Sequence, residues 1–214
     1  PPPVSAQMID QVLPRDSIQA IDEPQFEPAA AAARHLRPEE RVVGLVINGE
    51  ARAYPIAILS VHEIVNDLVG GEPVAITWCP LCYTALVFNR NIPGRAAPLS
   101  FGVSGKLLHN TLVMYDRQTE SLWSQLYGGA VSGSLTGRSL AVHPSQHTTW
   151  QAWRARHPQT EVLSKRLTCE QFDCGTYADN LRGSYVLDPY LSYYQTPDEG
   201  VVNAQIPRES ASSG

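Results

Sequence analysis

Short apolar runs separated by turn-forming residues dominate the middle of the chain, a pattern typical of β-strands. Residues 42–47 are rich in β-branched side chains, Asn48-Gly49 favours a two-residue hairpin turn, and residues 50–54 supply the partner strand. Between later Gly, Asn and Asp turn signals, the same pattern predicts strands over 74–78, 85–88, 99–103, 111–115, 122–127 and 140–143.

One segment instead has its apolar residues at helical spacing. It lies between Pro55, a favourable first helical residue, and Gly70-Gly71, a stop signal. The apolar positions are Ile58, Val61, Ile64, Val65 and Leu68. We therefore expect a helix over 55–69, which would put His62 and Asn66 on one face and Glu63 and Asp67 on another.

Two further helices are expected. A tryptophan-containing helix fits residues 148–156, and a short one fits the alanine-rich segment 29–36. Strands then outnumber helices by about three to one. The fold class that follows is α+β and β-rich, with an antiparallel sheet or barrel-like core and two or three helices.

The domain organisation follows from where these patterns weaken. Residues 1–40 contain seven prolines, so we expect an extended arm packed on the domain, where it covers a sheet edge. Residues 41–195 form a single globular domain in this interpretation, with tyrosine-rich loops between 163 and 194. Residues 196–214 form a C-terminal tail.

Composition excludes some classes of partner. The 214 residues carry 16 basic and 21 acidic side chains, a net charge of −5, and there is no Lys/Arg run. Such a chain is a poor candidate for binding nucleic acid. No segment approaches the roughly 18 apolar residues of a membrane-spanning helix, so none is predicted in this chain. Nothing in the composition indicates an oligomeric state.

The string Cys79-Pro80-Leu81-Cys82 carries the clearest candidate chemistry. Its spacing allows both sulfurs to bind one metal ion, to form a redox-active pair, or to close a structural disulfide. Residues 83–88 are partly β-branched and aromatic, which predicts a second strand after the pair. The cysteines then lie on a hairpin turn and not at a helix N-terminus, as they do in thioredoxin.

A second cysteine pair lies near the end of the expected domain. Cys169 and Cys174 could join the first pair in a four-sulfur zinc site, or could form a local disulfide. We favour the local disulfide. His62 is a further candidate metal ligand. It does not belong to an HExxH motif, because Asn66 stands where the second histidine would be. Ser104 lies in Gly-Val-Ser-Gly, which is not the GxSxG motif of a nucleophilic serine.

Several longer strings together resemble one known family, the prokaryotic domain-of-unknown-function family 3179. They are HEIVND at 62–67, CPLC at 79–82, GVSG at 102–105, MYDRQT at 114–119 and SLWSQ at 121–125. The resemblance covers about residues 40–165. It implies an extracytoplasmic location, since members often carry export or lipoprotein signals. It also implies one site assembled from shared polar positions: His62, Glu63, Asn66, Asp67, Cys79, Cys82, Ser104, Asp116, Arg117, Ser124 and Gln125.

The leading hypothesis is a metal-binding protein of redox character, with Cys79, Cys82 and His62 as ligands. Two thiolates and an imidazole suit copper or zinc, and a redox role favours copper. In this hypothesis, the side chains around the open coordination position of the metal ion are Ser104, Asp116, Asn66, Ser124 and Gln125.

Two alternatives stay open. One is a metal-free thiol–disulfide oxidoreductase that uses the same cysteine pair. The other is a structural or small-ligand-binding module in which the pair is a permanent disulfide. The partner is accordingly a small molecule or a redox protein.

Overall fold

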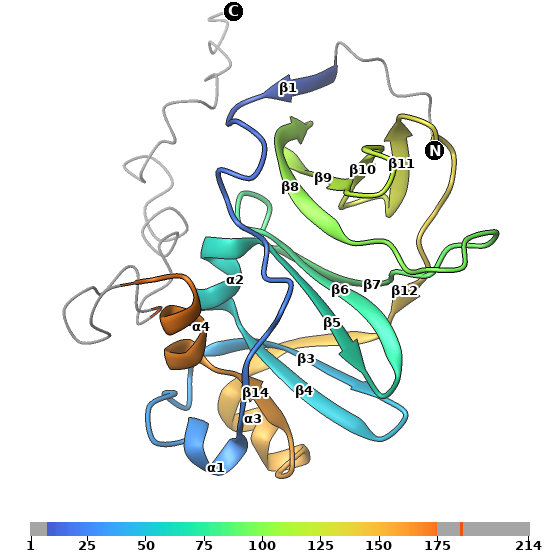
Figure 1. Cartoon of the computed structure of the whole chain (residues 1–214). Coiled ribbons are helices and arrows are strands. Elements are labelled where there is room, and N and C mark those ends of the chain that lie inside the picture. Colours follow the sequence, from blue (N-terminus) through green and yellow to red (C-terminus); the bar gives the residue numbers. More distant parts are fainter. Residues whose placement is uncertain (1–7, 175–184, 186–214) are drawn as a thin grey trace, which may run out of the picture.

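The computed structural model describes residues 8–174 and residue 185 (Figure 1). Three sheets, in which antiparallel pairing dominates, form most of this part of the chain, so the β-rich α+β class is confirmed. The central sheet has the order β12-β7-β6-β5. Its strands are β5 (Ile64–Val69), β6 (Glu72–Cys79), β7 (Thr84–Asn89) and β12 (Val142–His143).

The two other sheets lie on either side of the central one. The helix-covered sheet has the order β13-β3-β4-β14-β2, with β13 (Ser145–Thr149), β3 (Arg41–Ile47), β4 (Glu50–Pro55), β14 (Glu161–Leu163) and β2 (Phe26–Pro28). The curled sheet has the order β1-β8-β9-β10-β11, with β1 (Ile9–Gln11), β8 (Phe101–Leu108), β9 (Thr111–Asp116), β10 (Leu122–Ser124) and β11 (Gly129–Ser132).

The helices are α1 (Ala29–Ala32), α2 (Ile56–His62), α3 (Trp150–Arg156) and α4 (Lys165–Gln171). Each is too short to cross a bilayer, so no described helix qualifies as a membrane span. Helices α1 and α3 pack on the outer face of the helix-covered sheet, where Trp150 and Trp153 are buried against Val42 and Val162. The tryptophan-containing helix is therefore confirmed. It begins two residues later than expected and ends at the expected residue, Arg156.

The central sheet is buried on both faces, which decides where its side chains point. Trp78 packs in the core shared with the helix-covered sheet and α2, whereas the next residue, Cys79, packs in the core shared with the curled sheet. Successive side chains of a strand point to opposite faces. The thiol of Cys79 thus faces the curled sheet.

Several local predictions are confirmed. Asn48 and Gly49 have φ of 50° and 85°, the left-handed conformation that a tight hairpin turn requires, and β3 pairs with β4 across them. Strands β6, β7 and β9 cover the segments predicted at 74–78, 85–88 and 111–115.

The helix predicted over 55–69 is wrong in its second half. Helix α2 ends at His62, Glu63 has a φ of 60°, and Ile64–Val69 is strand β5. The β-branched residues of β5 hydrogen-bond to β6 on one side, and the arm bonds on the other through Ile21. These non-local bonds prevail over the helical spacing. His62 and Asn66 therefore do not share a helix face.

Other boundaries also differ. The strand predicted over 99–103 runs over Phe101–Leu108 instead, because a bulge between Val103 and Lys106 lets it continue. The strand predicted over 122–127 ends at Ser124, and that over 140–143 is only Val142–His143. Helix α4 occupies part of the stretch expected to be loop, with Ser164 as its N-cap. Most of the tyrosine-rich stretch and the whole tail lie outside the described residues.

The described part of the proline-rich segment contacts two of the sheets. Ile21 forms a parallel bridge with Val65 at the free edge of β5. Further towards the N-terminus, the amides of Val12 and Leu13 both donate to the carbonyl of Gly105, at 2.9 and 3.0 Å. A Cβ at Gly105, whose φ is 71°, would lie 2.0 Å from the carbonyl oxygen of Leu13. Glycine at this position thus permits the arm to lie directly on β8.

Replacing Gly105 with alanine should therefore destabilise the protein and displace the arm. We expect a loss of at least about 2 kcal/mol, from left-handed strain and the clash with Leu13 together. Gly49→Ala is the matched control, since Gly49 has a similar φ of 85° but nothing within 4 Å of a Cβ. Chemical unfolding measures both variants. Equal losses in the two variants would show that the contact between the arm and Gly105 adds no stability.

Candidate active site

The two cysteines of the CxxC string lie on the β6–β7 hairpin. Cys79 is the last residue of β6 and pairs with Thr84, the first residue of β7. The connecting turn includes Tyr83, whose φ is 51°. The predicted hairpin is confirmed. Neither cysteine is in a disulfide; Cys79 is buried, whereas Cys82 is partly exposed.

The surroundings of the two sulfurs favour charge on Cys82. A hydrogen bond from the Cys79 thiol, helped by the Thr84 side chain and the backbone amides of Cys82 and Thr84, lowers the pKa of Cys82 to about 6 despite partial burial. The same hydrogen bond, together with burial, raises the pKa of Cys79 far above its ordinary value. At neutral pH, Cys82 is therefore the thiolate and Cys79 the thiol that donates to it.

Glu63 provides a third ionisable group at this site. It follows α2, and its left-handed backbone turns the chain into β5. Its side chain is buried, and this burial, with the nearby Cys82 thiolate, raises its pKa to about 8. Glu63 is thus mostly a neutral carboxylic acid at pH 7. It can donate a proton next to a thiolate.

A small cavity adjoins these groups. Its volume is about 50 Å³, and its lining includes Glu63, Leu81, Lys106 and Leu112 together with residues of the arm. This space is large enough for a few water molecules and too small for a substrate.

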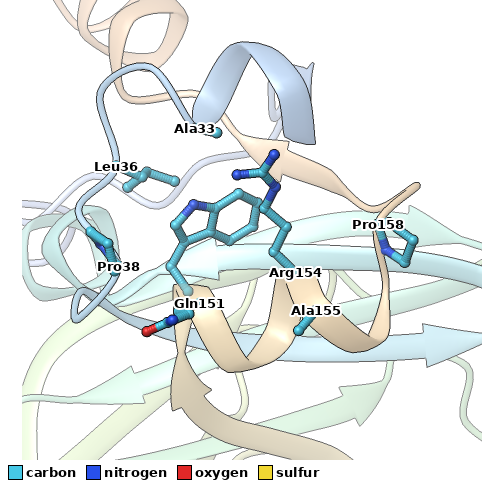
Figure 2. Close-up of a pocket in the computed structure, with 8 residues that line it drawn as sticks. Ala33, Leu36, Pro38, Gln151, Arg154, Ala155 and Pro158 are labelled. Carbon is cyan, nitrogen blue, oxygen red and sulfur yellow. The ribbon is translucent and has the colours of Figure 1, made fainter.

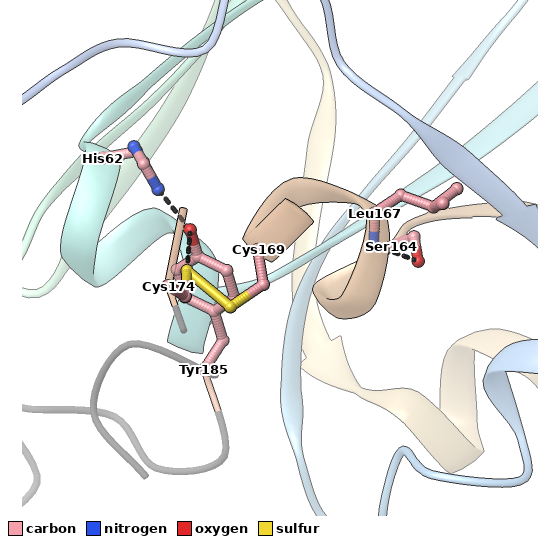
Figure 3. Close-up of a disulfide and its surroundings, with 6 residues drawn as sticks. All are labelled: His62, Ser164, Leu167, Cys169, Cys174 and Tyr185. Atoms are coloured by element: carbon pink, nitrogen blue, oxygen red, sulfur yellow. Dashed lines mark hydrogen bonds between the residues drawn. A yellow bond between two sulfur atoms is a disulfide. The ribbon is translucent and has the colours of Figure 1, made fainter. Parts of the chain in front are cut away.

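His62 points into a different environment. One ring nitrogen, Nε2, lies 2.7 Å from the hydroxyl of Tyr185 (Figure 3). The other, Nδ1, lies 2.6 Å from the carbonyl oxygen of Gln19. The ring also packs on Phe172, at 4.4 Å between centroids. Burial lowers its pKa, and the bond to Gln19 partly offsets that effect. Phe172 and Tyr185 belong to the core on the helix-covered side, opposite the core that contains Cys79.

Two other predicted site residues join strands. Asn66 is buried and forms a pair of hydrogen bonds with the backbone of Phe101, donating to its oxygen at 2.8 Å and accepting from its nitrogen at 3.0 Å. Ser104 donates to the carbonyl of Val113 and accepts from the amide of Lys106. The hydrogen bonds of Asn66 tie β5 to β8, and those of Ser104 stabilise the bulge in β8.

Asp116 organises the turn between β9 and β10. Its carboxylate accepts from the indole of Trp123 at 2.9 Å, and from the amide and hydroxyl of Thr119. Asp67 instead joins two sheets, because it accepts from the hydroxyl of Tyr54 in β4 at 2.6 Å. Arg117 donates to Asp22 of the arm at 2.8 Å. None of these bonds involves the cysteines.

Gln125, in contrast, lies at the cysteine hairpin. Its side-chain nitrogen donates to the carbonyl of Thr84 and the hydroxyl of Thr77, both at 3.2 Å, and its own amide donates to the carbonyl of Leu112. Ser124 is buried and accepts from the amide of Tyr127 at 3.4 Å. The structure thus brings Cys79, Cys82 and Gln125 to one hairpin, and Ser124 precedes Gln125 in sequence.

The second cysteine pair forms a disulfide, as favoured from the sequence. Cys169 in α4 is bonded to Cys174, and the sulfur of Cys174 lies 3.6 Å from the Tyr185 hydroxyl that contacts His62 (Figure 3). The disulfide therefore lies beside His62.

A larger groove of about 500 Å³ lies between α1 and α3 (Figure 2). Its lining is mostly apolar, from Ala33 and Leu36 to Pro158, with Gln151 and Arg154 as its polar side chains. It contains no thiol, carboxylate or imidazole. We therefore place the candidate active site at the cysteine hairpin, where the reactive groups lie.

This arrangement of side chains does not test the prediction that a metal ion binds here. Within residues 8–174 and 185, no three His, Cys, Asp or Glu side chains are grouped as metal ligands usually are. The copper or zinc site with His62 as third ligand stays a prediction.

Glu63 was predicted only as one of the shared polar positions that the resemblance implies, without a role of its own. The folded chain shows that its side chain is buried and interacts with the Cys82 thiolate. The sequence signal that could have indicated its burial was that Glu63 directly precedes the apolar residues Ile64 and Val65. The positive φ of Glu63, where the chain passes from α2 into β5, has no sequence signature in a non-glycine residue.

The described molecule is thus a β-rich domain of three stacked sheets with an unbridged CxxC pair on a central hairpin. By its sequence, the chain belongs to the family described as protein of unknown function (DUF3179), whose model matches residues 15–211. The match confirms the resemblance and extends it beyond 40–165 on both sides, so that it includes Cys169 and Cys174. No curated protein and no solved structure matches the chain.

Proposed function

We propose that this protein is a thiol–disulfide oxidoreductase, with Cys82 as the attacking thiolate and Cys79 as the resolving thiol. The observation that carries the proposal is the pair of unbridged, hydrogen-bonded sulfurs on one turn, with Cys82 partly exposed and Cys79 buried behind it. An attacking sulfur must reach its substrate, whereas a resolving sulfur needs to reach only the mixed disulfide.

The first step is attack by the Cys82 thiolate on a substrate disulfide. A bond forms between the Cys82 sulfur and one substrate sulfur, and the substrate S–S bond breaks. The electron pair of that bond leaves with the second substrate sulfur as a thiolate. The neutral carboxyl of Glu63, beside Cys82, can supply the proton that converts the leaving thiolate to a thiol.

The second step resolves the mixed disulfide. Cys79 loses its proton, for which the Glu63 carboxylate left by the first step is the acceptor, and attacks the sulfur of Cys82. The bond from Cys82 to the substrate breaks, and the substrate leaves as a thiolate. One substrate disulfide is then reduced to a thiol and a thiolate, which takes its proton from solvent, while Cys79 and Cys82 are oxidised to a disulfide. A second dithiol reverses these steps and regenerates the pair.

The test combines alkylation with redox titration. Alkylation of Cys82 by iodoacetamide should rise with pH around a midpoint near 6, and Cys79 should react far more slowly. In glutathione buffers, the same two residues should interconvert between dithiol and disulfide, as followed by mass spectrometry of cysteine-containing peptides. A Cys82 midpoint near the ordinary thiol value of 9.0, with no reversible disulfide, would contradict the proposal.

A metal centre is the second candidate, because two adjacent unbridged thiols also suit a soft ion such as copper(I). His62 would first have to leave Gln19 and Tyr185, which occupy both of its ring nitrogens. Elemental analysis of protein purified without chelator, beside a Cys79→Ser/Cys82→Ser variant, separates the two candidates. Stoichiometric copper or zinc that disappears in the variant supports the metal centre.

The Cys169–Cys174 disulfide supports the proposed extracytoplasmic location, since disulfides persist in oxidising compartments. Such a compartment also contains the protein disulfides on which a thiol–disulfide oxidoreductase would act.

A further inference from the structure

The groove between α1 and α3 has the size and lining of a small-molecule site (Figure 2). Its volume of about 500 Å³ lies within the range of roughly 300 to 1,000 Å³ that ligand sites occupy. Its apolar lining comes mainly from Leu36, Pro38, Ala155 and Pro158. In such a site a few polar groups orient the ligand. The polar groups of this groove therefore indicate what it binds.

Backbone hydrogen bonds fix one wall of the groove to the other. The amide of Trp150 donates to the carbonyl of Glu40 at 2.8 Å, and the amide of Gln151 donates to the carbonyl of Pro38 at 3.0 Å. These two bonds tie the loop between α1 and β3 to the first turn of α3. Because the walls are already joined, the groove is preformed, and a ligand does not have to order it.

The indole nitrogen of Trp150 is a hydrogen-bond donor without an acceptor. The three other tryptophans each donate from the indole to a side-chain oxygen, at 2.9 to 3.1 Å. Within residues 8–174 and 185, no acceptor bonds to the Trp150 indole, although only 2% of this residue is exposed. Its nitrogen is not among the polar atoms that the protein encloses completely, and Trp150 lines the groove. The indole N–H is therefore available to a ligand there.

Arg154 brings a positive charge to the same groove. Figure 2 shows its side chain extending from α3 towards α1. It forms no ion pair with any residue that the structure describes, whereas other arginines do. The two acids of the adjoining loop, Glu39 and Glu40, pair with other cations and do not line the groove. Trp150 and Arg154 are four residues apart in α3, so their side chains are neighbours on one helix face.

These polar groups favour an anion. An indole N–H and a guanidinium only donate hydrogen bonds, and the amide of Gln151 can donate as well. No carboxylate lines the groove to bind a cation. A single guanidinium matches one negative charge, and its planar fork matches the two oxygens of a carboxylate. The mostly apolar lining requires an apolar body behind that head group.

We propose that the groove between α1 and α3 binds a small monocarboxylic acid with an apolar body. Arg154 pairs with the carboxylate, the indole N–H of Trp150 donates to it, and the body lies against Leu36 and Pro158. The groove contains no cysteine. This inference is therefore independent of the function proposed for the cysteine hairpin, and each can fail without the other.

The experiment compares 4-phenylbutyrate with 4-phenylbutanamide, which has the same body and no charge. Titration of the full chain is followed by NMR of the four tryptophan indole N–H signals, and the Trp150 signal is identified by its loss in Trp150→Phe. The acid should bind at least about tenfold more tightly than the amide, and should shift the Trp150 signal more than the other three. Equal affinities, or an unchanged Trp150 signal, would overturn the proposal.

Arg154→Gln tests the charge on an exposed side chain, where folding is not at risk. This variant should bind 4-phenylbutyrate at least about tenfold more weakly and the amide as before. Arg156→Gln is the matched control, because it removes another arginine from the last turn of α3 that does not line the groove. It should keep the affinity of the unmodified chain. An unchanged affinity in Arg154→Gln, or equal losses in the two variants, contradicts the proposed contact.

The C-terminus of a polypeptide is another source of a carboxylate with an apolar neighbour. The tripeptide Ala-Ala-Phe, with a free and with an amidated C-terminus, is titrated in the same way. Binding of the free tripeptide without binding of 4-phenylbutyrate would assign the groove to a protein C-terminus and overturn the small-molecule class. Absence of binding by either carboxylate at concentrations up to about 10 mM would overturn the site itself.

Discussion

Replacing Cys82 with serine should abolish thiol–disulfide exchange, lowering the rate by at least about a thousandfold. The hydroxyl of serine stays protonated at neutral pH and does not attack disulfides, whereas the Cys82 thiolate is already formed near pH 6. A cysteine-containing peptide, supplied as its mixed disulfide with 2-thiopyridine, releases 2-thiopyridone on attack, and the rate of this release measures the loss. The Cys169–Cys174 disulfide should stay intact in the variant, which serves as an internal control for folding.

Replacing Cys79 with serine should have a different result. Attack by Cys82 continues, but the mixed disulfide cannot be resolved, so the peptide should stay covalently bound and be visible by mass spectrometry. Serine can still donate a hydrogen bond to the Cys82 thiolate; alanine cannot. Cys79→Ala should therefore also raise the midpoint of Cys82 alkylation above 6. If the Cys82 variant traps the peptide and the Cys79 variant does not, the two roles are reversed.

Glu63→Gln should change the pH dependence of stability. The folded protein holds the Glu63 proton up to about pH 8, whereas the unfolded chain releases it near 4.5. A carboxyl with a raised pKa makes the folded state lose stability as pH rises between these two values. The loss amounts to at most about 5 kcal/mol from this group. Glutamine does not titrate, so the variant should gain stability relative to the parent between pH 5 and pH 9.

Denaturant unfolding across that pH range measures this difference. Glu39→Gln makes the same chemical change at a side chain that is 70% exposed, and should leave the pH dependence nearly unchanged. Because the Cys82 thiolate contributes to the shift of Glu63, the effect of Glu63→Gln should shrink in a Cys82→Ser background. Parallel stability curves for Glu63→Gln and the parent would show that Glu63 is not a buried acid.

Elements with local signals were predicted well. The Asn48-Gly49 hairpin needs only a dipeptide with suitable backbone preferences, and the tryptophan-containing helix needs only its spacing. The cysteine hairpin was predicted from the β-branched and aromatic residues that follow Cys82. Glu63, whose burial depends on contacts between distant segments, was recognised only as a polar position.

The sequence by itself determined the β-rich class, the family and the position of the CxxC pair on a turn, because these follow from short segments and their spacing. Only the tertiary structure decided that residues 64–69 form a strand, since hydrogen bonds to β6 and Ile21 outweigh helical spacing there. It also decided which cysteine carries the charge and that Glu63 holds its proton. Both depend on burial and on donors brought together from separate elements, and no local pattern specifies them.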